Sequence, residues 1–323
     1  MTENKYLCIA CMCVMLVACK VKQPQMTDND WTLQELNGRV AKITETVCNL
    51  KVGDTTKQVI IFDTLGMITQ RSFYQHDSLS RQFVYGDSMR YEINGNGEIQ
   101  WIVYLTKDDK GRITEEYVQS PASDDRISYY VYNDKGFLVS ETVENDEQEI
   151  VSITNYEYND AGMLTKQIEL GTYGDISLIT LYEYTKHNKP VEIGLYNGEN
   201  QCVQRQVYKY DKAGNETEER YLDAWGNEFY CSRTVYENNK PVSKTCTGTN
   251  IYEQEYVYIY KKGVLKSSTI SEYDSIDGMH QLVILTEREC DGSGNWVEEK
   301  VTEPDVSKQP TIITHRSIEY YGD

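Results

Sequence analysis

Residue types on which helical folds and most catalytic sites rely are scarce in this chain. Only five alanines follow residue 19, and no long segment places apolar residues at helical spacing, which excludes a mainly helical fold. The four histidines are isolated, and no glycine-rich phosphate loop or Gly-x-Ser-x-Gly elbow occurs. The sequence therefore predicts no catalytic residue, no metal site and no cofactor.

Positive charge is also in short supply. The chain carries 32 Lys and Arg against 51 Asp and Glu, a net charge of −19. A surface this acidic repels phosphate backbones, so nucleic acid is not an expected partner. The same charge argues against docking on anionic lipid through a basic patch.

Cysteine pairs with metal-ligand or framework spacing are missing as well. Three of the nine cysteines lie in the N-terminal apolar run, and Cys19 ends it. The five that remain are an odd number without Cys-x-x-Cys spacing, which argues against a disulfide framework and a zinc site. One bridge among Cys202, Cys231 and Cys246 stays open as an alternative to free thiols.

The N-terminal residues 1–18 are predicted to be a targeting signal. Lys5 precedes an apolar run over 6–18 that spans roughly 20 Å as a helix, too short to cross a bilayer. The run ends in Leu-Val-Ala-Cys, which resembles the lipobox of bacterial lipoprotein signal peptides. That resemblance implies cleavage before Cys19 and attachment of lipid, palmitate included, to this residue. An ordinary secretion signal is the alternative, and residues 19–30 form a polar tether.

The residues after Cys19 bear on the location. The resemblance to Gram-negative lipoproteins implies outer-membrane anchoring, because Lys20 is not the usual inner-membrane retention signal. Residues 20–24 lack the acidic run that some bacteroidete lipoproteins carry for surface display. The periplasmic and the cell-surface face therefore both stay open, and the lipid membrane is the first expected partner.

Tyrosine pairs of the form Tyr-x-Tyr recur at a constant interval. Their second members, Tyr132, Tyr158, Tyr184 and Tyr210, follow one another at steps of 26 residues. Each pair runs into a polar turn such as Asn-Asp-Lys-Gly at 133–136, in which Asn opens a type I turn and Gly supplies a left-handed residue. A second turn falls midway, so each unit is predicted to contain two strands and two turns.

Residues 31–323 are predicted to form an all-β domain of tandem antiparallel hairpins. β-Branched residues and tyrosines alternate with polar residues over runs typical of strands. We expect roughly ten to twelve hairpins, which right-handed twist would coil into a long sheet or a partly closed shell. Asn188 and Asn239 take the left-handed position in two turns without Gly, and Asn37-Gly38 is interpreted as a further hairpin turn.

Three turn segments carry a family resemblance: Phe-Asp-Thr-Leu-Gly at 62–66, Tyr-Asp-Lys-Ala-Gly-Asn at 210–215 and Cys-Asp-Gly-Ser-Gly-Asn-Trp at 290–296. Here the chain resembles the YD-repeat, or RHS-repeat, family, whose Tyr-Asp-x-x-Gly units form hairpins that spiral into sheets or hollow shells. The likeness covers most of 55–300, but only Tyr210-Asp211 has the literal dipeptide with Gly in register. No Asp-Pro occurs, so we expect a degenerate-repeat bacteroidete lipoprotein without the self-cleaving core of RHS toxins.

Aromatic residues supply the candidate binding sites. Because residues i and i+2 of a strand share a face, stacked Tyr-x-Tyr pairs would form a ladder on which sugars could stack. The interpretation we favour is that the rings fill the interior of the sheet, because the chain has only five Phe against 27 Tyr. The candidates are Tyr158, Tyr184 and Tyr210 in the ladder, together with Trp225 and Trp296 at turns, where side chains lie on the surface.

The expected function is a non-catalytic envelope lipoprotein whose extended β-repeat surface binds a protein or glycan partner. The alternative is a polysaccharide-binding lipoprotein of a glycan uptake system, which needs exposed aromatic rings. A glycan-active enzyme would need two carboxylates in one cleft, and no pair stands out. The alternation Asp291-x-Ser293-x-Asn295 is similar to a calcium loop, but its downstream Glu is out of register, so a plain turn is predicted.

Overall fold

The structure is a computed structural model, and it describes residues 30–34, 36–249, 253–261, 264–273 and 280–322. Within this part the chain forms one 22-stranded antiparallel sheet and a short helix, α2 (Asp30–Leu33). The predicted signal peptide, Cys19 and the tether up to residue 29 lie outside the described residues. No helix among the described residues is long and apolar enough to span a membrane.

The strands are seven to eleven residues long, apart from the six-residue β5. The first eleven are β1 Val40–Asn49, β2 Asp54–Phe62, β3 Ile68–Gln75, β4 Ser78–Tyr85, β5 Met89–Asn94, β6 Ile99–Lys107, β7 Ile113–Ser120, β8 Ser123–Tyr132, β9 Leu138–Asn145, β10 Ile150–Tyr158 and β11 Leu164–Leu170. The others are β12 Ile176–Tyr184, β13 Pro190–Asn197, β14 Cys202–Tyr210, β15 Glu216–Asp223, β16 Glu228–Glu237, β17 Lys240–Gly248, β18 Glu253–Lys261, β19 Val264–Tyr273, β20 His280–Cys290, β21 Trp296–Thr302 and β22 Ile312–Tyr320.

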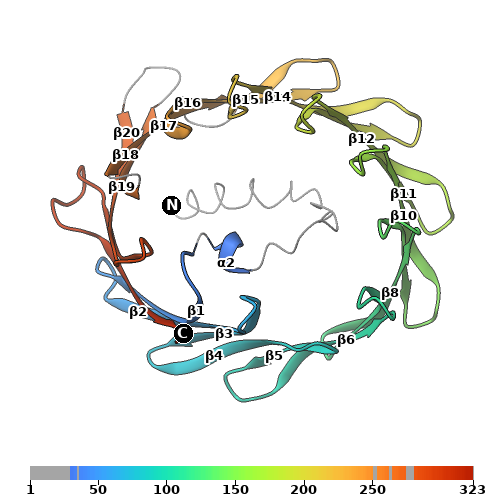
Figure 1. The fold of residues 1–323 in the computed structure, drawn as a ribbon, viewed down its shortest axis with the longest axis horizontal. Coiled ribbons are helices and arrows are strands. Elements are labelled where there is room, and N and C mark those ends of the chain that lie inside the picture. Colours follow the sequence, from blue (N-terminus) through green and yellow to red (C-terminus); the bar gives the residue numbers. More distant parts are fainter. Residues whose placement is uncertain (1–29, 35, 250–252, 262–263, 274–279, 323) are drawn as a thin grey trace, which may run out of the picture.

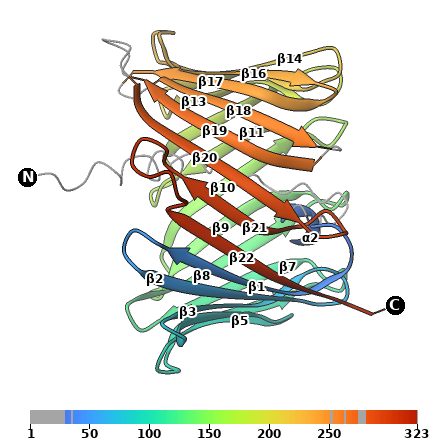
Figure 2. The same ribbon diagram turned by 90° about the vertical axis from the view of Figure 1, so that its left-hand side faces the viewer.

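The sheet closes on itself to form a barrel (Figure 1). Each strand pairs with the next along the chain, and β22 pairs with β1 from Val40 opposite Tyr320 to Asn49 opposite Ile312. The strands are inclined to the barrel axis (Figure 2). The all-β hairpin prediction is confirmed, but the sheet is more closed than the partly closed shell predicted. Closure removes both free edges, whose unpaired backbone groups would otherwise remain exposed.

The barrel is wide enough to enclose a lumen. At ~4.8 Å between strands, 22 strands give a perimeter of roughly 106 Å and a diameter of roughly 34 Å, before tilt widens it further. Side chains from opposite walls cannot meet across this distance. The wall is therefore a single layer of sheet with an inner and an outer face.

An apolar core lies where α2 packs inside the ring against β1 and β2 (Figure 1). Val40, Ile43, Ile60 and Phe62 are buried there, and Trp31 packs against them. The Trp31 indole N–H donates to the carbonyl of Val40 at 2.7 Å. The prediction that strands begin at Trp31 is wrong, because this residue belongs to α2 and anchors it to the inner wall.

Turn chemistry explains the repeat. In the turn after β8, Asn133 Oδ1 accepts a hydrogen bond from the backbone N–H of Phe137 at 3.0 Å, and Gly136 has a φ of 87°. Asn188 and Asn239, which stand in turns that lack Gly, both have a φ of 60°, as predicted. The same side-chain cap recurs in many of the turns, so these turns are specified by their own residues.

The Asn37-Gly38 dipeptide is not a hairpin turn, contrary to the prediction. It joins α2 to β1, and the buried side chain of Asn295 holds it in place. Asn295 Oδ1 accepts from the N–H of Asn37 at 2.7 Å, while Nδ2 donates to the Asn37 carbonyl at 2.8 Å and to the Tyr320 hydroxyl at 2.7 Å. We call Asn37, Asn295 and Tyr320 the seam latch, because they join the start of β1, the turn before β21 and the end of β22.

The Asp291 loop forms the predicted plain turn. Asp291 Oδ1 accepts from the backbone N–H groups of Ser293 and Asn295 at 2.9 and 3.0 Å. The five cysteines in the described part of the chain are free. Cys231 and Cys246 lie on neighbouring strands, but the register places Cys246 opposite Ser232, so the two thiols are on opposite faces of the wall.

Candidate functional site

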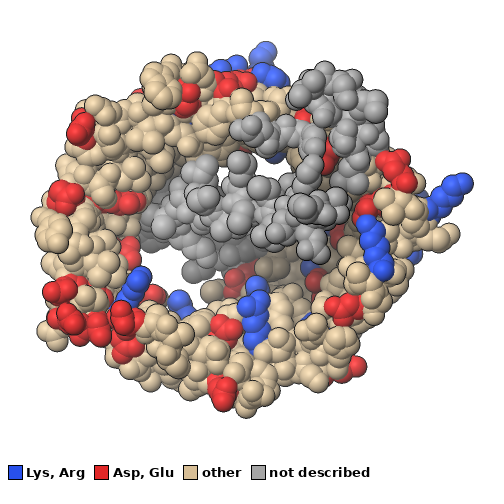
Figure 3. All heavy atoms as spheres, turned by 180° about the vertical axis from the view of Figure 1, so that it is seen from behind, with Lys and Arg blue, Asp and Glu red and all other residues tan. Residues whose placement is uncertain are grey.

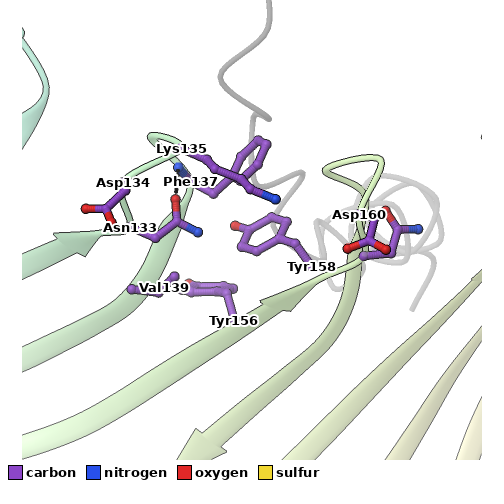
Figure 4. Close-up of a pocket in the computed structure, with 9 residues that line it drawn as sticks. Asn133, Asp134, Lys135, Phe137, Val139, Tyr156, Tyr158 and Asp160 are labelled. Atoms are coloured by element: carbon purple, nitrogen blue, oxygen red, sulfur yellow. Dashed lines mark hydrogen bonds between the residues drawn. The ribbon is translucent and has the colours of Figure 1, made fainter.

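The Tyr-x-Tyr pairs lie on the inner face of the wall. Residues paired across neighbouring strands share a face of the sheet. Ile60 packs under α2 and therefore faces inward, and the pairing from each strand to the next shows that the tyrosines lie on the same face as Ile60. The turns after the tyrosine pairs curl inward (Figure 1), and Tyr156 and Tyr158 point to the same side of the wall (Figure 4). In β18 the tyrosines are half-buried, whereas Val257 and Ile259 on the outer face are exposed.

In three repeats, the tyrosine that ends the strand donates to a carbonyl of the neighbouring strand, as the hydroxyl of Tyr132 does to Ile113 at 2.9 Å. The hydroxyls of Tyr158 and Tyr184 donate to the carbonyls of Leu138 and Leu164, at 2.8 and 2.6 Å. Burial raises the pKa of both tyrosines, and it raises the pKa of Tyr210 to about 12. The ladder therefore serves structure first, since its hydroxyls join neighbouring strands.

In four units, the ring of the tyrosine that ends a strand lies against the residue that follows the previous turn at the same rim. In three units this residue is a cation, and in one it is phenylalanine. The ring contacts are Arg112 with Tyr132 at 4.6 Å, Phe137 with Tyr158 at 5.0 Å, Lys189 with Tyr210 at 5.2 Å and Lys240 with Tyr260 at 5.1 Å. The unit with Phe137 thus differs from the other three, because it presents two aromatic rings and no cation between them.

A cavity of about 330 Å³ opens beside these two rings (Figure 4). Phe137 and Tyr158 are stacked with an interplanar angle of 21°. The cavity lies between two successive inward turns, and its polar lining comes from them. The lining residues are Asn133, Asp134, Lys135, Phe137, Val139, Tyr156, Tyr158, Asn159 and Asp160.

Three charged side chains that line this cavity have no side-chain partner among the described residues and can meet a ligand. Asn133 and Asn159 use their side-chain oxygens to cap their own turns, at 3.0 and 2.9 Å. Within the described part of the chain, no side chain forms a hydrogen bond or an ion pair with Asp134, Lys135 or Asp160. Aromatic rings bordered by short polar side chains suit a ligand that has both apolar C–H faces and many hydroxyls, and the volume matches a small ligand. A sugar has these properties.

The other predicted site residues are not brought to this cavity. Trp225 is 86% exposed in the turn between β15 and β16, where its backbone N–H donates to Asp223 Oδ1 at 3.0 Å. That turn is at the opposite rim from the tyrosine turns. Trp296 begins β21, where the guanidinium of Arg316 lies 3.4 Å and that of Arg288 5.4 Å from its ring centre. The ring of Trp296 is therefore in contact with two arginines, whereas the ring of Trp225 is exposed.

Sequence reasoning missed an aromatic cluster on the inner wall. Phe73 and Phe83 lie 6.0 Å apart, Phe83 and Trp101 lie 6.1 Å apart, and Arg81 lies over both phenylalanines at 4.8 and 5.4 Å. Trp101 Nε1 donates to Glu92 Oε2 at 2.6 Å. These residues belong to four different strands, so only the register of the sheet reveals that they meet.

The outer wall carries ion pairs that join neighbouring strands. Glu218 bonds Lys209 at 2.8 Å, Arg220 at 3.0 Å and Arg233 at 3.2 Å, across β14, β15 and β16. These residues alternate with the inward tyrosines, so they face outward. A wall embedded in lipid needs an apolar band about 25 Å tall. The ion pairs interrupt such a band on this side of the barrel.

No protein-family model matches the sequence, and no curated protein matches it. Among solved structures, the chain is similar to a TcdB2–TccC3 complex lacking the hypervariable C-terminal region (TM-score 0.35, 12% identity), to the Tc holotoxin pore of Photorhabdus luminescens (0.33, 11%) and to a porin-like protein from Bacteroides uniformis (0.34, 11%). The matches cover 80%, 82% and 88% of this chain, and 16%, 18% and 99% of the other chains. The chain thus spans under a fifth of the toxin chains. Scores this low do not show a shared fold, so the three likenesses carry no conclusion about this chain.

Proposed function

We propose that the protein is a non-catalytic, lipid-anchored envelope protein that binds a glycan in the cavity beside Phe137 and Tyr158. The observation that carries this proposal is the stacked pair of inward rings, bordered by Asp134, Lys135 and Asp160, whose side chains have no partner among the described residues. A sugar ring can lie on the aromatic side chains while its hydroxyls bond Asn133, Asp160 and Lys135. An enclosed lumen limits access to chains thin enough to enter it.

Membrane attachment through lipid at Cys19 is part of the proposal. The Leu-Val-Ala-Cys run at residues 16–19 supports it, and so do the outward ion pairs around Glu218, which are unsuited to a lipid-facing wall. We place the protein at the outer membrane and keep both its periplasmic and its cell-surface face as alternatives. A degenerate YD-repeat relationship fits the recurrent capped turns and remains part of this proposal.

Glycan binding can be measured by calorimetry and affinity electrophoresis with the full-length protein purified in detergent. Phe137→Ala removes one of the two stacked rings, and we expect binding of a retained glycan to weaken about tenfold, or ~1.4 kcal/mol. Trp225→Ala is the matched control, because it removes an aromatic side chain from the opposite rim. Equal affinity of wild type and Phe137→Ala for every retained glycan would contradict the proposal, as would hydrolysis of the glycan.

A protein partner at the opposite rim is the second candidate function. Tyr173 and Trp225 are 96% and 86% exposed there, in turns that follow β11 and β15. Large exposed aromatic side chains are typical anchors of protein interfaces. Cross-linking in intact cells, with wild type and a Tyr173→Ser/Trp225→Ser variant, tests this candidate. Cross-linking of the same envelope protein to both forms would contradict it.

A further inference from the structure

Two arginines and two phenylalanines alternate on the inner faces of β3 and β4. The register places Arg71 opposite Phe83 and Phe73 opposite Arg81. We call these four residues the Arg–Phe patch. Diagonal neighbours on one face of a sheet lie roughly 7–8 Å apart, so the two long guanidinium side chains reach a common point. The patch lies six strands from the cavity beside Phe137, or roughly 29 Å along the wall.

The guanidinium of Arg81 is held in place but is not neutralised. It lies over Phe73 at 4.8 Å and over Phe83 at 5.4 Å, and these ring contacts are its interactions with the described residues. No carboxylate in the described part of the chain pairs with it. Stacking on a ring leaves the N–H edge of a guanidinium available, so its donors are oriented before a ligand arrives.

Arg71 supplies a second, independent indication. Its Nε is buried and has no hydrogen-bond acceptor among the described residues. A buried donor without an acceptor costs about 1–3 kcal/mol, and no described residue offsets this cost for Arg71. The neighbouring carboxylate, Glu92, is already bonded to Trp101 Nε1 at 2.6 Å. This bond also fixes the half-buried indole ring beside Phe83.

Two unpaired guanidinium groups are unexpected in a chain with a net charge of −19. Seen from the opposite end of the barrel, both basic and acidic side chains border the opening (Figure 3). At physiological salt, charges are screened over about 8 Å, so Arg71, Arg81 and the single carboxylate of Glu92, rather than the distant acidic surface, set the potential at the patch. Two adjacent guanidinium groups beside aromatic rings match a single carboxylate on an otherwise hydroxylated ligand.

We propose that the Arg–Phe patch is a second lumenal site, which binds the carboxylate of an acidic sugar residue such as a uronate. Arg81 and Arg71 donate hydrogen bonds to the carboxylate oxygens, and Trp101 offers its ring to the sugar face. The site is independent of the cavity beside Phe137, so it stands whether or not that cavity binds glycan.

The test is calorimetric titration of the full-length protein in detergent with two matched probes, trigalacturonate and its carboxyl-reduced trisaccharide. We expect wild type to bind the acidic probe at least about tenfold more tightly. Arg71→Gln/Arg81→Gln should abolish this preference, and Arg81→Lys should retain part of it, because Lys keeps the charge without the planar fork. Phe137→Ala should leave the preference intact, which separates this site from the cavity.

Arg233→Gln is the control for charge alone, since it removes one guanidinium from the outer wall. It should bind the acidic probe as wild type does. Equal binding of both probes by wild type, or no binding of either, overturns the inference. If Arg81 serves only to cover Phe73 and Phe83, Arg71→Gln/Arg81→Gln lowers the melting temperature but keeps the preference, which also overturns it.

Discussion

Removing the Asn295 side chain should open the barrel at its seam. Asn295 is 3% exposed and makes three side-chain hydrogen bonds in the seam latch, two to the Asn37 backbone and one to Tyr320. A hydrogen bond contributes about 1 kcal/mol net, so the three together give roughly 3 kcal/mol. Asn37 is exposed, and water can replace part of what is lost. We therefore expect Asn295→Ala to lower the free energy of unfolding by about 2 kcal/mol.

Asn215→Ala is the matched control for this prediction. Asn215 occupies the same position in its turn, but its side chain bonds only Asp211 and Asn239, in exposed contacts at the rim. Its loss should cost less than about 1 kcal/mol, as surface substitutions usually do. Urea unfolding followed by circular dichroism measures both variants. Equal destabilisation by the two substitutions would refute the reasoning, because it would mean that the latch adds nothing beyond an ordinary turn.

Two further predictions concern the tyrosine ladder. Tyr184→Phe removes the 2.6 Å hydrogen bond to the Leu164 carbonyl and should lower the free energy of unfolding by about 1 kcal/mol. The control is Tyr173→Phe in an exposed turn, which should not change the free energy of unfolding measurably. Burial raises the pKa of Tyr210 to about 12 from 10.0, so the stability contributed by the neutral ring is complete below pH 10 and is lost as the pH rises toward 12. Unfolding and tyrosinate absorbance, recorded together in an alkaline titration, should rise in this interval. Ionisation of the full tyrosine complement without unfolding would contradict the burial of the ladder.

The repeat was predictable because its determinants are local. Asn133 caps its own turn four residues on, and Asn188 and Asn239 take left-handed conformations that their side chains tolerate. These interactions lie within a few residues of one another, so spacing alone reveals them. The tyrosine stripe was predicted for the same reason, since alternation fixes which residues share a face.

Closure and the binding sites were not predictable in the same way. The β1–β22 ladder joins Val40 to Tyr320, and no local pattern indicates this pairing. Trp101 meets Phe83 only because β4, β5 and β6 pair in one register. The interpretation of Asn37-Gly38 as a hairpin turn was wrong for a related reason. Its conformation is set by Asn295, which is 258 residues away in the sequence.

The central claim is that β22 returns to β1, so that the tyrosine stripe faces an enclosed lumen. The free thiol of Cys48 lies directly opposite Ile313 across this ladder, at a spacing that suits a disulfide. Oxidation of an Ile313→Cys variant should therefore give an intramolecular cross-link to Cys48, detected by non-reducing electrophoresis and peptide mapping. Thr314→Cys faces the other side of the wall and should not form this bond. Absence of the Cys48 cross-link in Ile313→Cys, or its equal formation in both variants, would contradict the closed barrel.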